Sequence, residues 1–192
     1  KFEKVMPKMT DAFEARAPRP WITVGHSMGA AFNLLTLEQH EPRIDGALLS
    51  SPMLRCQETS APLAGRWGAQ VTIEPAVTEI PSPDGYPLQE RVEWLSNAMA
   101  GEWAALGPFY TGFRDAIVER LLRCPVDTVV FSHYIAINAA IGVAVGDDRM
   151  VVRALDNCSV TILEVEGGLL RLVEGGHEAI YNTPNYRRLR ST

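Results

Sequence analysis

The sequence predicts an α/β fold, a three-layer α/β/α sandwich built around a mostly parallel sheet. Short β-rich runs alternate with helical segments along most of the chain, and turns rich in glycine or proline separate them. Near the end, two strand-like runs flank the pair Gly167–Gly168, which is typical of a hairpin. Strand–helix–strand alternation favours parallel pairing, and the hairpin predicts one antiparallel edge.

The first elements form a helix followed by a strand–helix–strand unit. Residues 2–17 are amphipathic, and the prolines at positions 18 and 20 end the predicted helix. A strand, a tight GHSMG turn, a helix and a buried strand follow, at residues 21–24, 25–29, 30–39 and 44–49. This unit is the building block of a parallel sheet.

The rest of the chain repeats the alternation. Helices are expected at residues 58–67, 88–103, 109–122 and 135–145, and strands at residues 70–74, 127–132, 159–165 and 169–173. The proline-rich residues 75–87 are expected to cross the surface as a loop. We therefore expect one domain over residues 1–192, with a first unit at 1–52, a second part at 53–174 and a C-terminal tail at 175–192.

Composition restricts the classes of partner. The net charge of −5 gives no general attraction to nucleic acid or anionic membrane, and no apolar run reaches the roughly 18 residues that a transmembrane helix needs. The three cysteines, Cys56, Cys124 and Cys158, contain no CxxC pair. Such a sparse, odd set favours a reducing compartment, hence the cytoplasm, and buried thiols with no activating base beside them. Composition does not indicate an oligomeric state.

Three chemically capable side chains follow predicted strands. His26 follows the strand at 21–24, Arg55 follows the strand at 44–49 with Ser51 and Pro52 before it, and His133 follows the strand at 127–132. Ligands of open α/β sheets bind beyond the carboxyl ends of the strands. The two histidines and the arginine are therefore expected to converge on one edge of the sheet.

Residues 49–174 resemble the histidine phosphatase (phosphoglycerate-mutase-like) superfamily. The segments that carry the resemblance occur in the family's order, and they are SSPMLRCQETSAPLAGRWG, TEIPSPDG, DTVVFSHYIAIN and DNCSVTILEVEGGLLRLVE. The SSPxxRxxxT stretch and the serine–histidine pair that ends a strand are the most specific of these features. The resemblance implies hydrolysis of a small-molecule phosphate ester without metal or other cofactor.

The resemblance also implies a role for each site residue. His26 occupies the place of the phosphoacceptor, and Arg55 and a protonated His133 would bind phosphoryl oxygens. Glu79 lies where the family often places its proton donor, which would protonate the leaving oxygen and later activate water. The family's Arg-His-Gly motif is replaced by Gly25-His26-Ser27, so one phosphoryl-binding arginine is absent.

The first 53 residues and the C-terminus resemble instead an α/β-hydrolase of the lysophospholipase or monoacylglycerol-lipase type. Gly25-His26-Ser27-Met28-Gly29 has the GxSxG pattern of a nucleophile elbow, with a strand before it and a helix after it. Asp148 and His177 follow in the order of a Ser–Asp–His triad. This resemblance implies an alternative, a serine esterase or lipase that acts on a carboxyl ester.

The sequence thus resembles a composite, with lipase-like ends and a phosphatase-like middle that meet at LLSSPML. Both families place their nucleophile after the same strand, so a junction here preserves the sheet. A third hypothesis is a catalytically impaired α/β fold that acts as a binding module.

Overall fold

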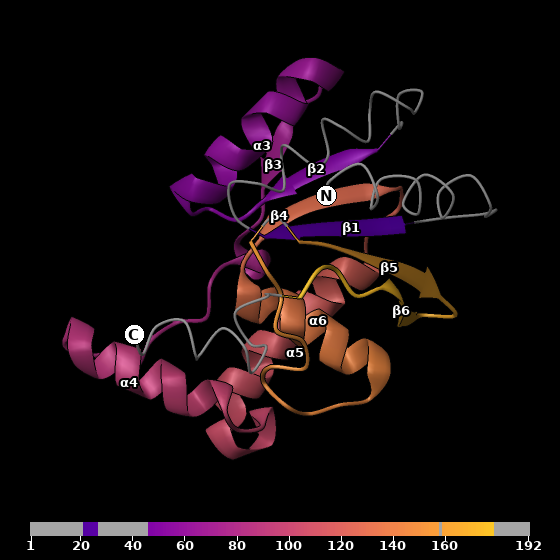
Figure 1. The fold of residues 1–192 in the computed structure, drawn as a ribbon. Coiled ribbons are helices and arrows are strands. Elements are labelled where there is room, and N and C mark those ends of the chain that lie inside the picture. Colours follow the sequence, from indigo (N-terminus) through magenta and orange to yellow (C-terminus); the bar gives the residue numbers. More distant parts are fainter. Residues whose placement is uncertain (1–20, 27–45, 158, 179–192) are drawn as a thin grey trace, which may run out of the picture.

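A computed structural model describes residues 21–26, 46–157 and 159–178, and only the backbone of residues 21–26. The six described strands form one sheet in the order β3-β2-β4-β1-β5-β6 (Figure 1). Their bounds are Trp21–His26 for β1, Ala47–Ser50 for β2, Val71–Ile73 for β3, Thr128–Ser132 for β4, Val160–Glu166 for β5 and Leu169–Glu174 for β6.

The sheet is mostly parallel, as predicted. Strands β3, β2, β4 and β1 run parallel to one another, whereas β5 is antiparallel to β1 and β6 is antiparallel to β5. Gly167 and Gly168 join β5 to β6 with φ angles of 59° and 80°. Successive residues with positive φ are what a two-residue hairpin turn requires, and glycine adopts them without steric cost.

Helices cover both faces of the sheet. The helices are α3 (Leu54–Trp67), α4 (Leu88–Met99), α5 (Pro108–Leu122) and α6 (Tyr134–Val145), and two short 3-10 helices lie at η1 (Pro75–Val77) and η2 (Trp103–Leu106). Figure 1 shows α3 on one side of the sheet and α5 and α6 on the other, with α4 extending away from it. The described residues therefore form the expected α/β/α layers.

Successive side chains of the central strands point to opposite faces of the sheet, so the hydrophobic core consists of two clusters, one on each face. On β4, Val129 and Phe131 pack with Leu63 of α3, whereas Val130 packs with α5 and α6. Successive side chains of a strand point to opposite faces, so a strand covered on both sides is apolar throughout. Helix α6 is correspondingly apolar on all sides, with Ile137 and Ile141 fully buried.

Two helix boundaries differ from the predictions. Helix α3 begins at Leu54 rather than Glu58, directly after the Ser51–Pro52 turn, so Arg55 belongs to its first turn. The predicted helix at 88–103 ends at Met99, and Trp103 begins η2 instead. The break follows from tertiary bonds, because Trp103 N–H and Met150 N–H bond the carbonyls of Asp148 and Gly101. The helices predicted at 2–17 and 30–39 lie outside the described residues.

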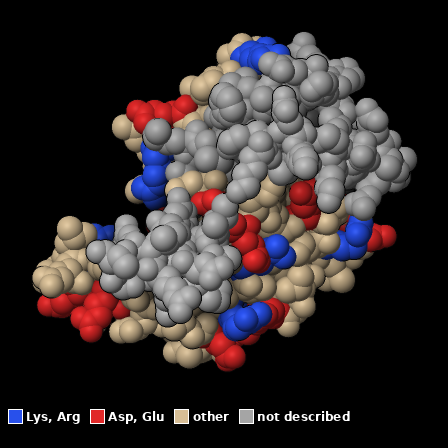
Figure 2. Space-filling model, in the orientation of Figure 1, with Lys and Arg blue, Asp and Glu red and all other residues tan. Residues whose placement is uncertain are grey.

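The described surface carries charges of both signs. On the face shown in Figure 2, basic and acidic side chains are interspersed over the described part of the chain. Described ion pairs such as Arg149–Asp147 and Arg171–Glu164 join a largely exposed arginine to a less exposed acid. None of the described helices is both long and apolar enough to span a bilayer.

Candidate active site

Three parallel strands end together at one edge of the sheet. The register places His26 of β1 beside Ser132 of β4, and it places Phe131 of β4 beside both Gly25 and Ser50. The carboxyl ends of β1, β2 and β4 therefore lie side by side. This is the edge at which α/β sheets bind ligands.

Two helices begin at this same edge. Met53 is the N-cap of α3 and His133 is the N-cap of α6, and neither side chain bonds a first-turn N–H group. The N-terminus of a helix carries a partial positive charge and N–H groups that its own turns do not use. Two such ends make the edge suitable for an anion.

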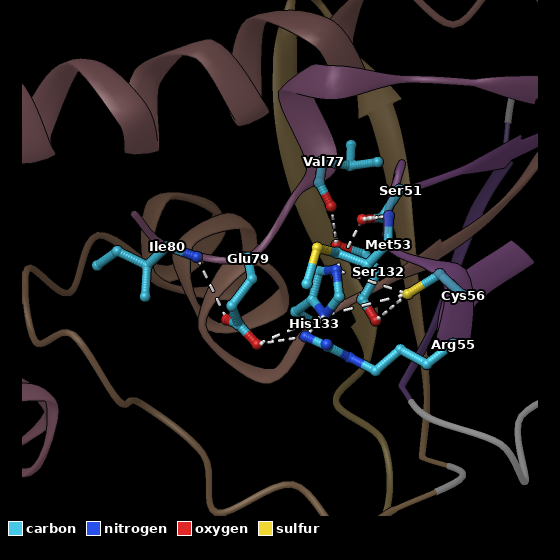
Figure 3. A network of polar contacts seen from close by, with 9 residues as sticks. All are labelled: Ser51, Met53, Arg55, Cys56, Val77, Glu79, Ile80, Ser132 and His133. Atoms are coloured by element: carbon cyan, nitrogen blue, oxygen red, sulfur yellow. Dashed lines mark hydrogen bonds and ion pairs between the residues drawn. The ribbon is translucent and has the colours of Figure 1, made fainter. Parts of the chain in front are cut away.

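Arg55, Glu79 and His133 meet here, and we call them the Arg55–Glu79–His133 cluster. Arg55 Nη2 lies 2.8 Å from His133 Nδ1 and 3.1 Å from Glu79 Oε2. Glu79 Oε2 lies 3.4 Å from His133 Nδ1. Figure 3 shows the guanidinium and the carboxylate converging on one side of the imidazole ring. The His133 ring is 2% exposed, whereas Arg55 and Glu79 are 46% and 34% exposed, so the cluster opens to solvent through the latter two side chains.

The start of the proline-rich loop determines where Glu79 lies. Glu74 caps η1 by accepting a hydrogen bond from Ala76 N–H, and Arg120 of α5 holds the same carboxylate. Ser132 Oγ, at the end of β4, donates to the Val77 carbonyl at 2.7 Å. The Val77 side chain is buried, so residue 79 follows a segment that is fixed to the sheet edge.

Burial raises the pKa of the Glu79 carboxyl above its ordinary value. The hydrogen bond from Ile80 N–H and the Arg55 guanidinium act in the opposite direction, but they do not outweigh the loss of hydration. A carboxyl group with a raised pKa keeps its proton to a higher pH than an ordinary glutamate does, which suits a general acid.

Ser51 and Cys56 contact the other side of the His133 ring. Ser51 Oγ lies 2.7 Å from Nε2, and Cys56 Sγ lies 3.5 Å from the same nitrogen (Figure 3). Cys56 and Cys124 are buried free thiols, as predicted, but the prediction that no base lies beside them was wrong for Cys56. Burial nevertheless raises the pKa of the Cys56 thiol to about 11, so the thiol is not activated.

Sequence reasoning placed Ser51 after the strand at this edge but assigned it no role, and it missed the contact of Cys56 with His133. Ser51 is the second serine of SSP and directly follows β2, the strand that precedes Arg55, which is the one indication that the sequence offered. Cys56 follows Arg55 directly, and its contact with His133 depends on α3 beginning four residues earlier than predicted. Cys158 lies outside the described residues.

The predicted residues of the alternative triad lie in different surroundings. Asp148 accepts hydrogen bonds from Arg114 at 2.6 Å and from Ala104 N–H at 3.0 Å. One carboxylate oxygen therefore bonds α5 and the other bonds η2. His177 is exposed, and its carbonyl accepts from Asp156 N–H. No hydrogen bond or ion pair joins Asp148 to His177, both of which the structure describes. Ser27 lies outside the described residues, as does the side chain of His26.

In the described ranges, no three His, Cys, Asp or Glu side chains are grouped as a metal site requires.

Comparison with protein families gives a match at the first half of the chain. A family model described as serine aminopeptidase, S33, matches residues 4–96, a range that includes the GHSMG turn and ends within α4. The match echoes the α/β-hydrolase resemblance of the N-terminal unit. No curated protein matches the chain significantly.

Solved structures match over most of the chain. YhfR from Bacillus stearothermophilus has a TM-score of 0.64 at 16% identity, over 83% of this chain and 98% of that one. A putative α-ribazole-5′-P phosphatase from Escherichia coli gives 0.62 at 14%, over 84% and 99%. The α-ribazole phosphatase from Shigella flexneri gives 0.58 at 16%, over 81% and 95%. The described residues share the fold of these three structures. The TM-scores show a shared fold, and at identities of 14–16% the likeness goes no further, so function has to be argued from the residues of the site.

Proposed function

We propose that this protein hydrolyses phosphate monoesters of small molecules through a phosphohistidine formed on His26. The observation that carries the proposal is the Arg55–Glu79–His133 cluster at the sheet edge where β1 ends in His26. A guanidinium, a buried imidazole and a carboxyl group with a raised pKa are the groups that in-line phosphoryl transfer requires.

The reaction proceeds in two steps that conserve atoms and protons. An unprotonated His26 nitrogen attacks phosphorus, a P–N bond forms, and the ester P–O bond breaks while Glu79 gives its proton to the leaving oxygen. Glu79, now ionised, removes a proton from water, whose oxygen attacks phosphorus. The P–N bond breaks, inorganic phosphate leaves, and Glu79 holds a proton again. Arg55 and His133 bind the phosphoryl oxygens throughout, where negative charge is greatest.

The shared fold supports the proposal, as do the two helix N-termini at the same edge. Gly25 in place of the family's arginine removes one phosphoryl donor. By analogy with the loss of one oxyanion donor, we expect a rate about 100-fold below that of a site with both arginines.

The test is a paired assay of p-nitrophenyl phosphate and p-nitrophenyl butyrate on the purified chain. We expect phosphate release that falls to background in His26→Ala and by about 100-fold or more in Arg55→Ala and His133→Ala. Ser27→Ala, one residue from the proposed nucleophile, is the matched control and should retain phosphatase activity. Phosphatase activity that survives His26→Ala in a folded sample contradicts the proposal.

A serine esterase with Ser27, Asp148 and His177 is the second candidate, and the family match over residues 4–96 favours it. Butyrate ester turnover and covalent labelling of Ser27 by a fluorophosphonate would support this candidate. The bonds of Asp148 to Arg114 and Ala104 argue for the first candidate, because they use the carboxylate that a triad needs for its histidine. If a cooperatively folded sample hydrolyses neither ester, the result would favour the third hypothesis, a catalytically impaired fold that acts as a binding module.

A further inference from the structure

We infer that Ser51 is a positioning residue for His133: by accepting the Nε2 proton it holds the ring with Nδ1 toward Arg55, and it so keeps the neutral ring in the tautomer that Arg55 selects. The inference about the tautomer depends only on the contacts around the ring. Its consequence for catalysis rests on the proposed function.

The contact with Arg55 determines which nitrogen carries the lone pair. Arg55 Nη2 lies 2.8 Å from His133 Nδ1, within hydrogen-bond distance. A guanidinium has donors only and is not deprotonated in proteins, so Nδ1 accepts this bond. The neutral imidazole therefore carries its single proton on Nε2.

Ser51 is placed to accept that proton. Its Oγ is 2.7 Å from Nε2, and the residue is 0% exposed, so no water competes for the bond. Met53 N–H also donates to Ser51 Oγ, at 3.2 Å, which fixes the hydroxyl oxygen relative to the start of α3. Cys56 Sγ, 3.5 Å from Nε2, is a longer and weaker acceptor.

The remaining protons of the network are consistent with this direction. Burial raises the pKa of the Cys56 thiol to about 11, so the thiol keeps its proton. The protonated thiol of Cys56 in turn donates to the Ser132 carbonyl at 3.5 Å. Nε2–H of His133 and the Cys56 thiol thus each meet an acceptor, and the Arg55 contact with Nδ1 sets the direction of the bond between His133 and Ser51.

This arrangement gives the two ring nitrogens different tasks. Nε2–H donates to Ser51 in both the neutral ring and the imidazolium, so this half of the ring stays unchanged. Nδ1 is the nitrogen that accepts from Arg55 in the empty site and that, once protonated, donates to a phosphoryl oxygen. The groups facing His133 from the described elements are Ser51, Arg55, Cys56 and Glu79.

The direct test is long-range ¹H–¹⁵N NMR of the full chain labelled on histidine, with the His133 signals assigned from His133→Ala. In the wild-type protein above the titration of the ring, we expect a pyrrole-like Nε2 and a pyridine-like Nδ1. A pyrrole-like Nδ1 overturns the proposal. Because this measurement needs no activity, it remains decisive even when the phosphatase proposal fails.

Ser50 and Ser51 provide a matched pair of variants. Both are fully buried, but Ser50 Oγ donates to the Ser51 carbonyl and does not touch the ring. Without Ser51 the ring is free to turn away from Arg55, so we expect Ser51→Ala to lose the single-tautomer ¹⁵N pattern and Ser50→Ala to keep it. Ser51→Cys, which keeps a side chain of similar size with a weaker acceptor, takes the place of Ser51→Ala when the latter does not fold. An unchanged pattern in the Ser51 variant overturns the proposal.

Kinetics then test the consequence for catalysis. A misplaced phosphoryl donor lowers the rate of the chemical step, so kcat for p-nitrophenyl phosphate should fall by about 10- to 100-fold in Ser51→Ala while KM changes less than about threefold. Ser50→Ala should keep both values near those of the wild type. Equal losses in the two variants indicate a general effect on folding and overturn the positioning role. An inactive wild-type protein counts against the proposed function alone.

Discussion

At Glu79 two opposing effects act on one carboxyl group. The ion pair with Arg55 and the hydrogen bond from Ile80 N–H favour the carboxylate, whereas burial favours the protonated form and outweighs them. The Arg55 guanidinium is shared with His133 at 2.8 Å, a shorter distance than the 3.1 Å to Glu79. Arg55 therefore stabilises the glutamate less than an undivided pair would.

The raised pKa of Glu79 predicts the alkaline limb of the pH profile. A general acid must be protonated, so kcat/KM should fall as the pH rises through the pKa of Glu79 in the free enzyme. Because that pKa lies above its ordinary value, the fall should begin at a higher pH than for an unperturbed glutamate. The measurement is kcat/KM against pH with glycerol phosphate, whose alkoxide leaving group needs the proton.

Glu79→Gln should remove this limb and lower kcat/KM for glycerol phosphate by about 100-fold or more. For p-nitrophenyl phosphate, which expels a stable phenolate, the loss in kcat/KM should be less than about tenfold. Equal losses for the two substrates would assign Glu79 a role in binding rather than in proton transfer.

Among the elements, the segment after α6 fastens η2 and α5 to the core. Arg114 of α5 and Ala104 N–H of η2 bond the carboxylate of Asp148, and the Asp148 carbonyl accepts from Trp103 N–H. Trp103 is almost fully buried, so these bonds keep a large side chain in place. Asp148, which the lipase resemblance assigned to a triad, therefore stabilises the packing of η2 and α5.

Asp148→Ala should lower the free energy of unfolding by about 1–2 kcal/mol, the cost of a lost charge-assisted hydrogen bond and a lost cap. Chemical denaturation measures the change. Asp147→Ala, which removes the ion pair with Arg149 and the hydrogen bond from the Arg149 backbone N–H, is the matched control and should lower the free energy of unfolding by less than Asp148→Ala does. Phosphatase kcat/KM should change little in either variant, and a selective loss of butyrate ester turnover in Asp148→Ala would instead support the triad.

For the whole molecule, an anion bound at the sheet edge should stabilise the native state. Orthovanadate, which takes the trigonal-bipyramidal geometry of phosphoryl transfer, adds about 2.7 kcal/mol at 100 times its Kd. A chain of this size should then show a Tm about 5–10 °C higher. Thermal unfolding monitored by circular dichroism with and without orthovanadate tests this.

Arg55→Ala should abolish the orthovanadate shift, because it removes the donor that holds the anion. Asp147→Ala, just beyond the opposite end of α6 from His133, should keep the full shift. A shift of equal size in all three proteins would mean that the anion binds elsewhere.

The strands and their mostly parallel pairing were predictable because they depend on local patterns in the sequence. The apolar run at 127–132 and the glycine pair at 167–168 each indicate one kind of element, and the structure confirms both. Parallel strands place their carboxyl ends at one edge, so the nearness of Arg55 to His133 also followed from the order of the elements. The roles of these residues in catalysis stay predictions.

The sequence by itself determined an α/β sandwich, its antiparallel edge and the strand ends at which chemically capable residues lie. Only the tertiary structure decided that Glu79 and Arg55 share the same side of His133, that Ser51 and Cys56 lie on the other, and that Asp148 serves α5. These contacts join residues between 24 and 82 positions apart. The reason is physical: helical and strand periodicities fix which face a residue occupies, whereas contacts between loops and helix starts depend on how whole elements pack.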